Sequence, residues 1–495
     1  MKDQKQFIST RGNAESATAP EAVLRGLASD GGLYTLRDVP RIDPAELIHL
    51  DFCGMAKRIL GAYMAGYPQA DIDACVDAAY ADKFDDPCIA PLCAVGDRYM
   101  LELFHGPTAA FKDVALSLLP QLTSAAMRLT KFDREILILT ATSGDTGSAA
   151  MKGFQNVEGV RIIAFYPDRG ISPIQRAQMT TMSGSNVCAC AVSDNFDAAQ
   201  TGVKRIFSEI SPEFCAENHV ALSSANSINF GRLAPQIVYY YSAYLDLVRN
   251  GRIQMGDPVN FCVPTGNFGD ILAGWYARRS GLPIDQLICA SNENNVLTDF
   301  FRTGVYDKRR EFHVTASPSM DILVSSNLER LLFEMLDYDA QAVRDRMEAL
   351  KNEGFYTMPD AAMEKLRARF AAYCVSDERA FAAIRKTLME TGYLMDPHTA
   401  VAWQAAEDCR AQTGDSRPCV VLSTASPYKF PVSVLTALGE VVPENVRDQI
   451  AALERVSGTR APKSIRGVLG SPVRFTDVID PKDMMTYVMG KAANR

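Results

Sequence analysis

The sequence predicts an α/β fold made of mainly parallel sheets with helices on both faces. Three observations lead to this prediction. Short apolar runs recur along the chain, most of them end in a polar or glycine-containing turn, and a helical pattern follows that turn. This order of strand, turn and helix is typical of parallel sheets, in which ligands collect at the carboxyl ends of the strands. The turns are therefore where functional residues are expected.

The N-terminal part of the chain differs from the remainder. Residues 1–95 contain an alanine-rich amphipathic stretch at 52–64, several Pro and Asp breaks, and the turn "SDGGLY" at 29–34. No regular alternation of apolar runs and helical patterns is visible there. We expect this segment to form an additional N-terminal domain.

A lysine then stands at an apolar junction. Lys112 belongs to "HGPTAAFKD" (105–113), between a Gly-Pro turn and the apolar run "VALSLLP", with Asp113 as its charged neighbour. A lysine in such surroundings is paired, solvated or used chemically. A packed or salt-bridged side chain is the simplest interpretation, and the later turns decide whether a chemical role is preferable.

The turn "TATSGDTGSAA" (140–150) follows the apolar run that begins at 135 and precedes a helical pattern. Its polar groups are the hydroxyls of Thr142, Ser143 and Thr146 and the amides of Gly144 and Gly147. One interpretation is a helix capped by Asp145 or Ser143. The other is a pocket for a carboxylate or a phosphate at the start of that helix.

A further strand is predicted at "VRIIAFYPD" (160–168), and a polar segment, "SANSINFGR", follows at 224–232. This segment contains Asn226, Ser227 and Arg232. Arginine offers a planar and permanently charged group that suits an oxyanion. A lone arginine is more often a surface residue, so the hypothesis of an anion site depends on the polar neighbours.

The segment "PVNFCVPTGNFGD" (258–270) has the same strand-to-turn form. Gly266 and Gly269 let backbone amides approach an anion, Asn267 adds a side-chain donor, and a helix starting near Asp270 directs its positive end to the same point. The segment is neither a Walker loop nor a dinucleotide fingerprint. It indicates a phosphate cradle, although glycine turns after strands are common.

Residues 340–400 read mostly as helix, and the last strand candidate is "RPCVVLSTASPYKF" (417–430). It ends in "STAS" (423–426), which carries hydroxyls and no acid or base. A neutral hydroxyl can hold an unprotonated heterocyclic nitrogen. A lysine, a glycine cradle, an anion pocket and a strand-end hydroxyl together fit pyridoxal phosphate, with Lys112 as its covalent anchor and proton carrier.

The composition narrows the possible functions. The 495 residues are 47% hydrophobic and 22% charged, with a net charge of −8, and runs of Lys and Arg are absent. These values suit sizeable cores and an ordinary soluble surface, and the absence of basic runs argues against nucleic acid as the main partner. No apolar stretch is long enough to span a membrane, and the N-terminus lacks the apolar core of a signal peptide. The 12 cysteines show no metal-binding spacing, which predicts reduced thiols in a cytoplasmic protein.

The motifs closely resemble those of threonine synthase, a family of pyridoxal-phosphate enzymes with the tryptophan-synthase-like fold (fold type II). The resemblance covers nearly the whole chain, in the family's order, through "STRG", "EAVLRGLASDGGLYTL", "HGPTAAFKDVAL", "TATSGDTGSAA", "GISPIQ", "NSINFGRLAPQIVYYY", "PTGNFGD", "SPSMDILVSSNLER" and "DPHTAVAW". It implies an N-terminal domain at 1–95, a large cofactor-binding domain at 96–130 and 225–495, and a smaller mobile α/β domain at 131–224.

The resemblance also implies roles for individual residues. Lys112 corresponds to the Schiff-base lysine and is the expected catalytic residue. The cofactor phosphate loop corresponds to Gly266, Asn267, Phe268 and Gly269, and the residue facing the pyridine nitrogen to Thr424. The substrate carboxylate loop corresponds to Thr142, Ser143, Asp145 and Thr146, and the substrate phosphate site to Asn226, Ser227 and Arg232. No metal is implied.

The implied reaction converts O-phospho-L-homoserine and water into L-threonine and phosphate, in a protein that is a monomer or a homodimer. A related phospho-lyase releasing 2-oxobutyrate, or a threonine or serine dehydratase, is the alternative. A non-catalytic homologue would be expected to lack Lys112 or the glycine cradle. The chain departs from the family's "TAHPAKF" with "TASPYKF", where Ser426 replaces His and Tyr428 replaces Ala, while Thr424 and Lys429 are kept. A smaller departure is alanine in "GPTAAFKD", where leucine is common.

Overall fold

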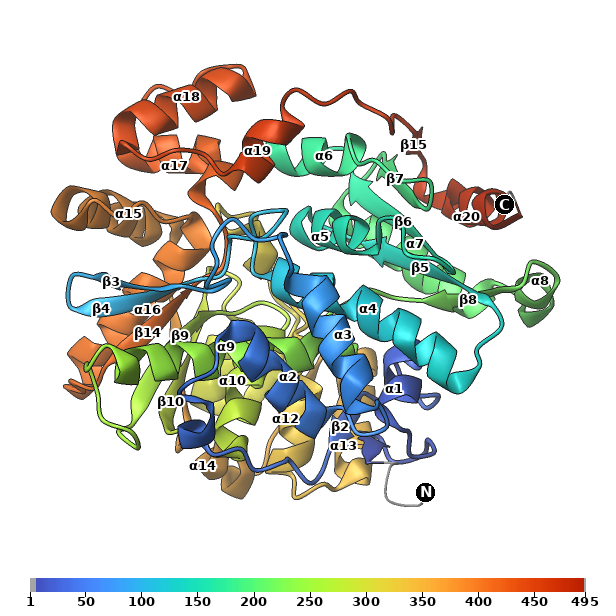
Figure 1. Cartoon of the computed structure of the whole chain (residues 1–495), viewed down its shortest axis with the longest axis horizontal. Coiled ribbons are helices and arrows are strands. Elements are labelled where there is room, and N and C mark those ends of the chain that lie inside the picture. Colours follow the sequence, from blue (N-terminus) through green and yellow to red (C-terminus); the bar gives the residue numbers. More distant parts are fainter. Residues whose placement is uncertain (1–5, 494–495) are drawn as a thin grey trace.

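The computed structural model describes residues 6–493, and within this range two parallel sheets organise the molecule (Figure 1). The larger sheet has the strand order β13-β10-β9-β14-β4-β3, parallel except for the antiparallel β3–β4 edge. Its strands are β3 (Leu92–Val95), β4 (Arg98–Glu102), β9 (Val259–Pro264), β10 (Ile284–Ser291), β13 (Phe370–Cys374) and β14 (Cys419–Ser423).

The smaller sheet has the order β15-β7-β6-β5-β8 and all of its pairs are parallel. Its strands are β5 (Glu135–Ala141), β6 (Val160–Pro167), β7 (Val187–Val192), β8 (Val220–Ser223) and β15 (Val478–Ile479). The four apolar runs predicted as strands are therefore β5, β6, β9 and β14. Two antiparallel pairs complete the described strands, β1 (Phe7–Ser9) with β2 (Tyr34–Leu36) and β11 (Val305–Asp307) with β12 (Phe355–Thr357).

Helices cover both sheets. In the first half of the chain they are α1 (Ala19–Arg25), α2 (Phe52–Tyr63), α3 (Gln69–Tyr80), α4 (Lys112–Thr130), α5 (Asp145–Phe154), α6 (Pro173–Thr180), α7 (Phe196–Glu209), α8 (Pro212–Glu217) and α9 (Phe230–Arg249). The second half contains α10 (Gly269–Ser280), α11 (Val296–Thr303), α12 (Leu328–Met335), α13 (Ala340–Asn352), α14 (Asp360–Arg367), α15 (Asp377–Thr391), α16 (Pro397–Thr413), α17 (Pro431–Leu438), α18 (Val446–Ser457), α19 (Lys463–Val468) and α20 (Met484–Ala493). Short 3-10 turns occur at η2 (Pro44–Leu47), η3 (Pro318–Met320), η4 (Pro427–Lys429) and η5 (Pro481–Asp483).

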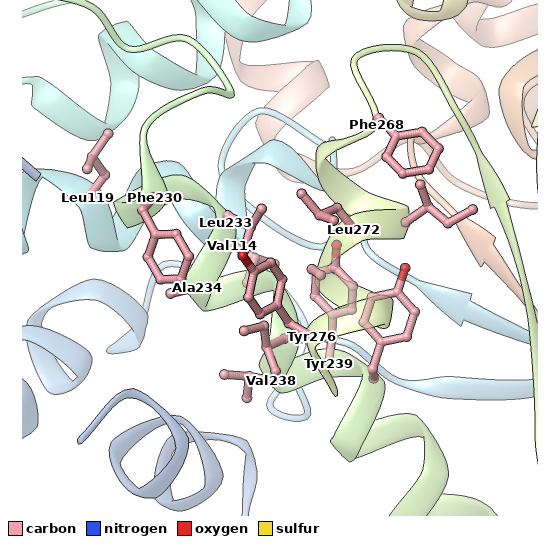
Figure 2. Packing of buried hydrophobic residues seen from close by; sticks show 14 of the residues in the cluster. Val114, Leu119, Phe230, Leu233, Ala234, Val238, Tyr239, Phe268, Leu272 and Tyr276 are labelled. Carbon is pink, nitrogen blue, oxygen red and sulfur yellow. The ribbon is translucent and has the colours of Figure 1, made fainter. Parts of the chain in front are cut away.

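Three helices that begin at polar motifs share one core. Helix α9 contacts both α4 and α10. Figure 2 shows its buried side chains, among them Phe230, Leu233 and Tyr239, together with Val114 of α4 and Leu272 of α10. Because these helices pack on one another as rigid units, the positions of their first residues are fixed relative to each other.

The structure departs from the sequence-based expectation in two places. Residues 340–400 are mostly helical as predicted, but β12 and β13 interrupt the helices, and β13 forms an edge of the larger sheet. Strand β15 and helix α20 lie far along the chain, yet β15 pairs with β7 and α20 packs on α7 (Figure 1). The expected domain boundaries stay a prediction.

Candidate active site

Lys112 is the first residue of helix α4, and a tight turn holds the backbone before it. The side chain of Asp113 accepts hydrogen bonds from the backbone N–H of Thr108 at 2.8 Å and from the Thr108 hydroxyl at 2.6 Å. Between them, Ala109 has φ of +57°, a left-handed conformation that alanine rarely adopts. Strain of this kind persists where neighbouring contacts enforce it, and it clusters at functional sites.

The amine of Lys112 is buried among charged groups. Its Nζ lies 3.4 Å from Oδ2 of Asp145 and 3.5 Å from the hydroxyl of Ser319. Burial lowers the pKa of Lys112, and the positive charges of Lys429 and Arg232 lower it further, while Asp145 opposes them. The contact with Asp145 is an ion pair of the ammonium form. The lowered pKa makes this ammonium easier to convert into the neutral amine that a nucleophile or base requires.

Asp145 begins helix α5, and its carboxylate has four partners. Oδ1 lies 2.7 Å from Nζ of Lys429 and accepts a hydrogen bond from the side chain of Gln175 at 2.9 Å. Oδ2 faces Lys112 and accepts from Ser319 at 3.2 Å. Burial alone would raise the pKa of Asp145, but the two lysines and the hydrogen bonds hold it well below its usual range. Asp145 is therefore a carboxylate at neutral pH.

The turn before α5 binds its two predicted glycine amides internally, so the amides of Gly144 and Gly147 are not free for a ligand as the sequence suggested. Gly144 occupies the N-cap position without a side-chain cap, so the capping interpretation of Asp145 or Ser143 is wrong. Instead, the hydroxyl of Thr142 accepts from the N–H groups of Gly144 at 2.9 Å and Gly147 at 2.8 Å. The side chains of Ser143 and Thr146 are partly exposed beside this helix start.

The glycine loop lies between β9 and α10. In the part of the chain that the structure describes, the backbone N–H groups of Gly266, Asn267, Phe268 and Gly269 have no hydrogen-bond acceptor. The carbonyls of the loop are held from behind, because Ser325 donates to the Gly266 carbonyl at 2.8 Å and Asn327 to the Asn267 carbonyl at 3.0 Å. A Cβ at residue 266 would lie 2.6 Å from the Ser319 carbonyl oxygen. These features fit a backbone cradle for a phosphate group.

Arg232 lies in the first turn of α9 and is 3% exposed. Its Nη1 donates to the carbonyl of Ala225 at 2.8 Å, its Nε has no partner, and no carboxylate of residues 6–493 forms an ion pair with it. Burial lowers its pKa to about 10. A buried cation without a counter-ion is costly unless an anion completes the site.

The neighbours of Arg232 complete this polar loop. Asn226 and Ser227 are partly exposed and precede the cap residue Asn229, whose side chain accepts from Gly231 at 2.9 Å. The hydroxyl of Ser227 accepts from the Asn327 amide at 3.2 Å, and the same amide donates to the glycine loop. The predicted substrate-phosphate residues and the predicted cofactor loop are thus joined by one side chain.

Sequence reasoning did not find Asn327 or its support, Arg330. Arg330 is 2% exposed and donates to Asn327, to the Ile228 carbonyl and, at 2.9 Å, to the Tyr34 carbonyl. Both residues belong to "SPSMDILVSSNLER", which stood out as a family motif without roles for its members. Their function depends on contacts between segments about 60 to 300 residues apart along the chain.

Thr424 follows β14 and is paired with the backbone before Lys112. Its carbonyl accepts from the N–H of Phe111 at 2.8 Å, and Ala110 forms an isolated antiparallel bridge with Ala425. The Thr424 hydroxyl forms no hydrogen bond to another described residue, and its role toward the pyridine nitrogen stays a prediction.

The two departures in this segment have structural roles. Ser426 caps η4 by accepting from the N–H of Tyr428, and Tyr428 is buried with its hydroxyl 2.8 Å from that of Thr459. This turn also carries Lys429, which is fully buried.

A histidine supports the site from behind. His398 shares a 2.6 Å hydrogen bond with Asp396 through Nδ1, and its Nε2 accepts from the backbone N–H of Ser319 at 3.1 Å. Since Nε2 accepts, the ring proton lies on Nδ1. The buried pair fixes Ser319, whose carbonyl packs on Gly266 and whose hydroxyl reaches Asp145.

Other features lie outside this constellation. A cavity of about 670 Å³ is lined by Pro107, Ser117, Gln121 and Lys152 among others, and contains none of the predicted site residues. In the described range, no group of three or more His, Cys, Asp or Glu side chains could hold a metal ion. None of the described helices combines the length and apolarity that crossing a bilayer requires.

Comparison with protein families gives three matches along the chain. The model described as "Pyridoxal-phosphate dependent enzyme" matches residues 98–424, which include Lys112, the glycine loop and Thr424. The model "Threonine synthase N terminus" matches residues 6–80, and "Threonine synthase, C-terminal" matches residues 399–484.

Individual relatives agree with these matches. The threonine synthase of Pseudomonas aeruginosa is 40% identical over 461 residues, covering 91% of this chain and 94% of that protein. Human "Threonine synthase-like 1" is 41% identical over 459 residues, which are 88% of this chain. The match spans 61% of that human protein, about three fifths of its length. The crystal structure of PLP-bound threonine synthase from Brucella melitensis has a TM-score of 0.87, 37% identity and 99% coverage of both chains.

Proposed function

Since the chain belongs to the threonine synthase family of pyridoxal-phosphate-dependent enzymes, we propose that it converts O-phospho-L-homoserine and water into L-threonine and phosphate. The observation that supports this substrate is Arg232, a buried cation without a carboxylate partner among the described residues. The glycine loop already serves one phosphate. A second anion site beside it is needed for a phosphorylated substrate and is superfluous for serine or threonine.

The residues around Lys112 fit pyridoxal phosphate. The unpaired N–H groups of residues 266–269 suit the cofactor phosphate. Lys112 would bind its aldehyde, and the Thr424 hydroxyl would contact a neutral ring nitrogen. When bound, this cofactor withdraws electrons and makes protons on Cα and Cβ of an amino acid removable. The chain must then orient the substrate, exclude water from the wrong positions and move protons.

Three groups of residues would divide this work. The N-terminal end of α5, with Thr142, Ser143 and Thr146, would hold the substrate carboxylate. Lys112, once deprotonated, would take the Cα proton and then, after passing that proton on, a Cβ proton. After phosphate leaves Cγ, one proton would be returned to Cγ and one to Cα. Water would add its hydroxyl at Cβ, and its remaining proton would go to the released phosphate. Arg232 with Asn226 and Ser227 neutralises the phosphate as it leaves Cγ. Asp145 would keep Lys112 oriented while its own negative charge stays paired.

Product analysis tests this function. Incubation of the purified enzyme with O-phospho-L-homoserine should release phosphate and L-threonine in equal amounts. Release of phosphate with 2-oxobutyrate would instead identify the related phospho-lyase activity. Turnover of serine or threonine without a comparable rate on phosphohomoserine would identify a dehydratase.

We also propose a cytoplasmic location. All 12 cysteines lie in the described range and are free thiols, as expected in a reducing compartment. Whether the protein is a monomer or a homodimer stays a prediction, which light scattering of the purified enzyme would test.

A further inference from the structure

A second buried lysine faces the same carboxylate as Lys112. Lys429 is completely shielded from solvent, and its Nζ lies 2.7 Å from Oδ1 of Asp145 and 2.8 Å from the Thr108 carbonyl. The other carboxylate oxygen, Oδ2, lies 3.4 Å from Lys112. Asp145 therefore bridges two lysines that are 317 residues apart in the sequence numbering but adjacent in the fold.

Lys429 contacts both segments that determine where Lys112 lies. Through Thr108 it binds the turn that precedes α4, and through Asp145 it binds the start of α5. Its own turn, η4, follows Ala425, which bridges Ala110. A lysine that merely filled core volume would not need two such contacts at its amine in addition to a backbone bridge beside its turn.

We propose that Lys429 is a positioning residue for the reactive lysine. Its ammonium holds the Asp145 carboxylate against Lys112 and adds a second positive charge beside that amine. The inference rests on the proposed role of Lys112 as the cofactor anchor. It does not depend on which substrate is converted.

The charges around the amine give the proposal a direction. Lys112 is faced by Asp145 from α5, by Lys429 from η4 and by Arg232 from α9, while Ser319 of η3 contributes an uncharged hydroxyl. The charge of Lys429 also reaches Asp113. Lys429 lowers the pKa of Lys112, so removal of the Lys429 charge should raise it. Asp145 raises the pKa of Lys112, so removal of the Asp145 charge should lower it.

The experiment is recombination of full-length apoenzyme with pyridoxal phosphate as a function of pH, followed by absorbance. The rate depends on the neutral amine of Lys112, so its midpoint reports the pKa of that group. Lys429→Met should raise the midpoint, Asp145→Asn should lower it, and the double variant should lie between them. A higher pKa leaves a smaller fraction of Lys112 as the neutral amine, so we expect recombination at pH 7 to slow about tenfold in Lys429→Met.

Matched controls separate positioning from stability. Arg98 is a buried cation outside the candidate site. It is the first residue of strand β4, and its Nη1 donates to the Trp403 carbonyl at 2.9 Å. Arg98→Met should lower the melting temperature and leave the midpoint unchanged. Lys429→Arg keeps the charge and should keep the midpoint closer to that of the wild type than Lys429→Met does.

The proposal is overturned if Lys429→Met has the wild-type midpoint and only loses stability, as Arg98→Met does. If Lys429→Met does not fold, the double variant Lys429→Met/Asp145→Asn is compared with Asp145→Asn instead. In the double variant the Asp145 carboxylate does not lose its lysine partner, because both charges are removed together. Equal midpoints in those two proteins would show that Lys429 exerts no influence on Lys112. Because no phosphohomoserine is used, a failure of the proposed reaction would leave these midpoints unaffected and would be seen separately in the product analysis.

Discussion

The backbone N–H of Phe111 donates to the carbonyl oxygen of Thr424 across 2.8 Å. The residue before Lys112, the predicted cofactor anchor, is therefore tied to the residue expected to meet the pyridine nitrogen. Because the bond joins two backbones, side-chain substitutions at Thr424 can change the chemistry without moving Lys112.

Replacement of Thr424 by aspartate should disturb the reaction more than replacement by serine. An aspartate stabilises a protonated ring nitrogen, whereas a hydroxyl suits a neutral one. We expect Thr424→Asp to lower kcat about tenfold or more and to change the ratio of threonine to 2-oxobutyrate. Thr424→Ser retains the hydroxyl and should retain most of the turnover. Wild-type rates and products in Thr424→Asp would contradict the assigned role.

Lys112→Ala should abolish turnover while leaving the phosphate loop able to bind the cofactor. Borohydride treatment of the wild-type enzyme should fix the cofactor to the peptide containing residue 112, as peptide mass spectrometry would reveal. In Lys112→Ala that labelled peptide should be missing. A label on another lysine in the wild-type protein would refute the assignment.

Arg232→Ala should act on phosphohomoserine far more than on substrates without phosphate. Loss of a charge-assisted contact to a buried anion costs about 2–4 kcal/mol, which corresponds to a fall of about 30- to 1000-fold in kcat/KM. The absorbance spectrum of the bound cofactor should remain normal, and any slow reaction of serine or threonine should change much less. An equal loss on both kinds of substrate would mean that Arg232 supports the fold or the carboxylate.

Gly266→Ala should weaken cofactor binding more than Gly269→Ala does. A Cβ at 266 would lie 2.6 Å from the backbone oxygen of Ser319. Ser319 cannot shift without disturbing the hydrogen bond that its backbone N–H donates to Nε2 of His398. At 269 the nearest atoms would be 3.5 Å and 3.7 Å away, which are ordinary contacts. We expect the Kd for pyridoxal phosphate to rise about tenfold or more in Gly266→Ala. Equal affinities by fluorescence titration would show that the loop adjusts freely.

Asp270 should make stability depend on pH. Its Oδ1 accepts from Tyr239 at 2.5 Å and Tyr240 at 3.0 Å, while Oδ2 has no partner among the described residues. Burial raises its pKa to about 7, from a usual value of 3.8. Between these values the unfolded chain releases a proton that the folded chain keeps, so this residue lowers stability as the pH rises, and its effect levels off above pH 7.

The test compares wild type with Asp270→Asn by denaturant unfolding from pH 4 to 8. The free energy of unfolding of the variant minus that of the wild type should rise by about 1.4 kcal/mol per pH unit until about pH 7 and then level off. Other carboxylates cancel in the difference. A difference that does not change with pH would mean that Asp270 does not retain its proton in the folded protein.

Much of the fold could be predicted because its signals are local. The strands β5, β6, β9 and β14 are apolar runs that end in polar turns, and parallel strands bring those turns to the same edge of a sheet. Strand β13 could not be predicted, because its sequence "FAAYC" lies between two helical patterns. Its strand conformation depends on pairing with β10.

Some residues of the candidate site could likewise be predicted from the sequence, and others depend on contacts between distant segments. Lys112 was predicted as a site residue because a lysine at an apolar junction needs a partner or a use and because the polar turns elsewhere fit the same cofactor. The segment "TASPYKF" places Lys429 in comparable surroundings. The same reasoning could have identified Lys429 as a buried cation. Its partner could not have been read from the sequence, because only the tertiary fold brings Asp145 to it. Asn327 and Arg330 act by hydrogen-bonding distant carbonyls, which has no sequence signal.

The pairing of β15 with β7, and of α20 with α7, has a consequence for how the protein is made. A ribosome releases β7 and α7 long before it synthesises residues 478–493. During that interval the edge of β7 lacks its partner β15, and the apolar side chains that later pack on Met484 and Val488 lack this cover. The nascent chain thus presents a site where chaperones, or other nascent chains, compete with its own C-terminal segment. Stalled or prematurely terminated translation products that stop before Val478 would keep that surface exposed and enter the aggregation or proteolysis pathways of the cell.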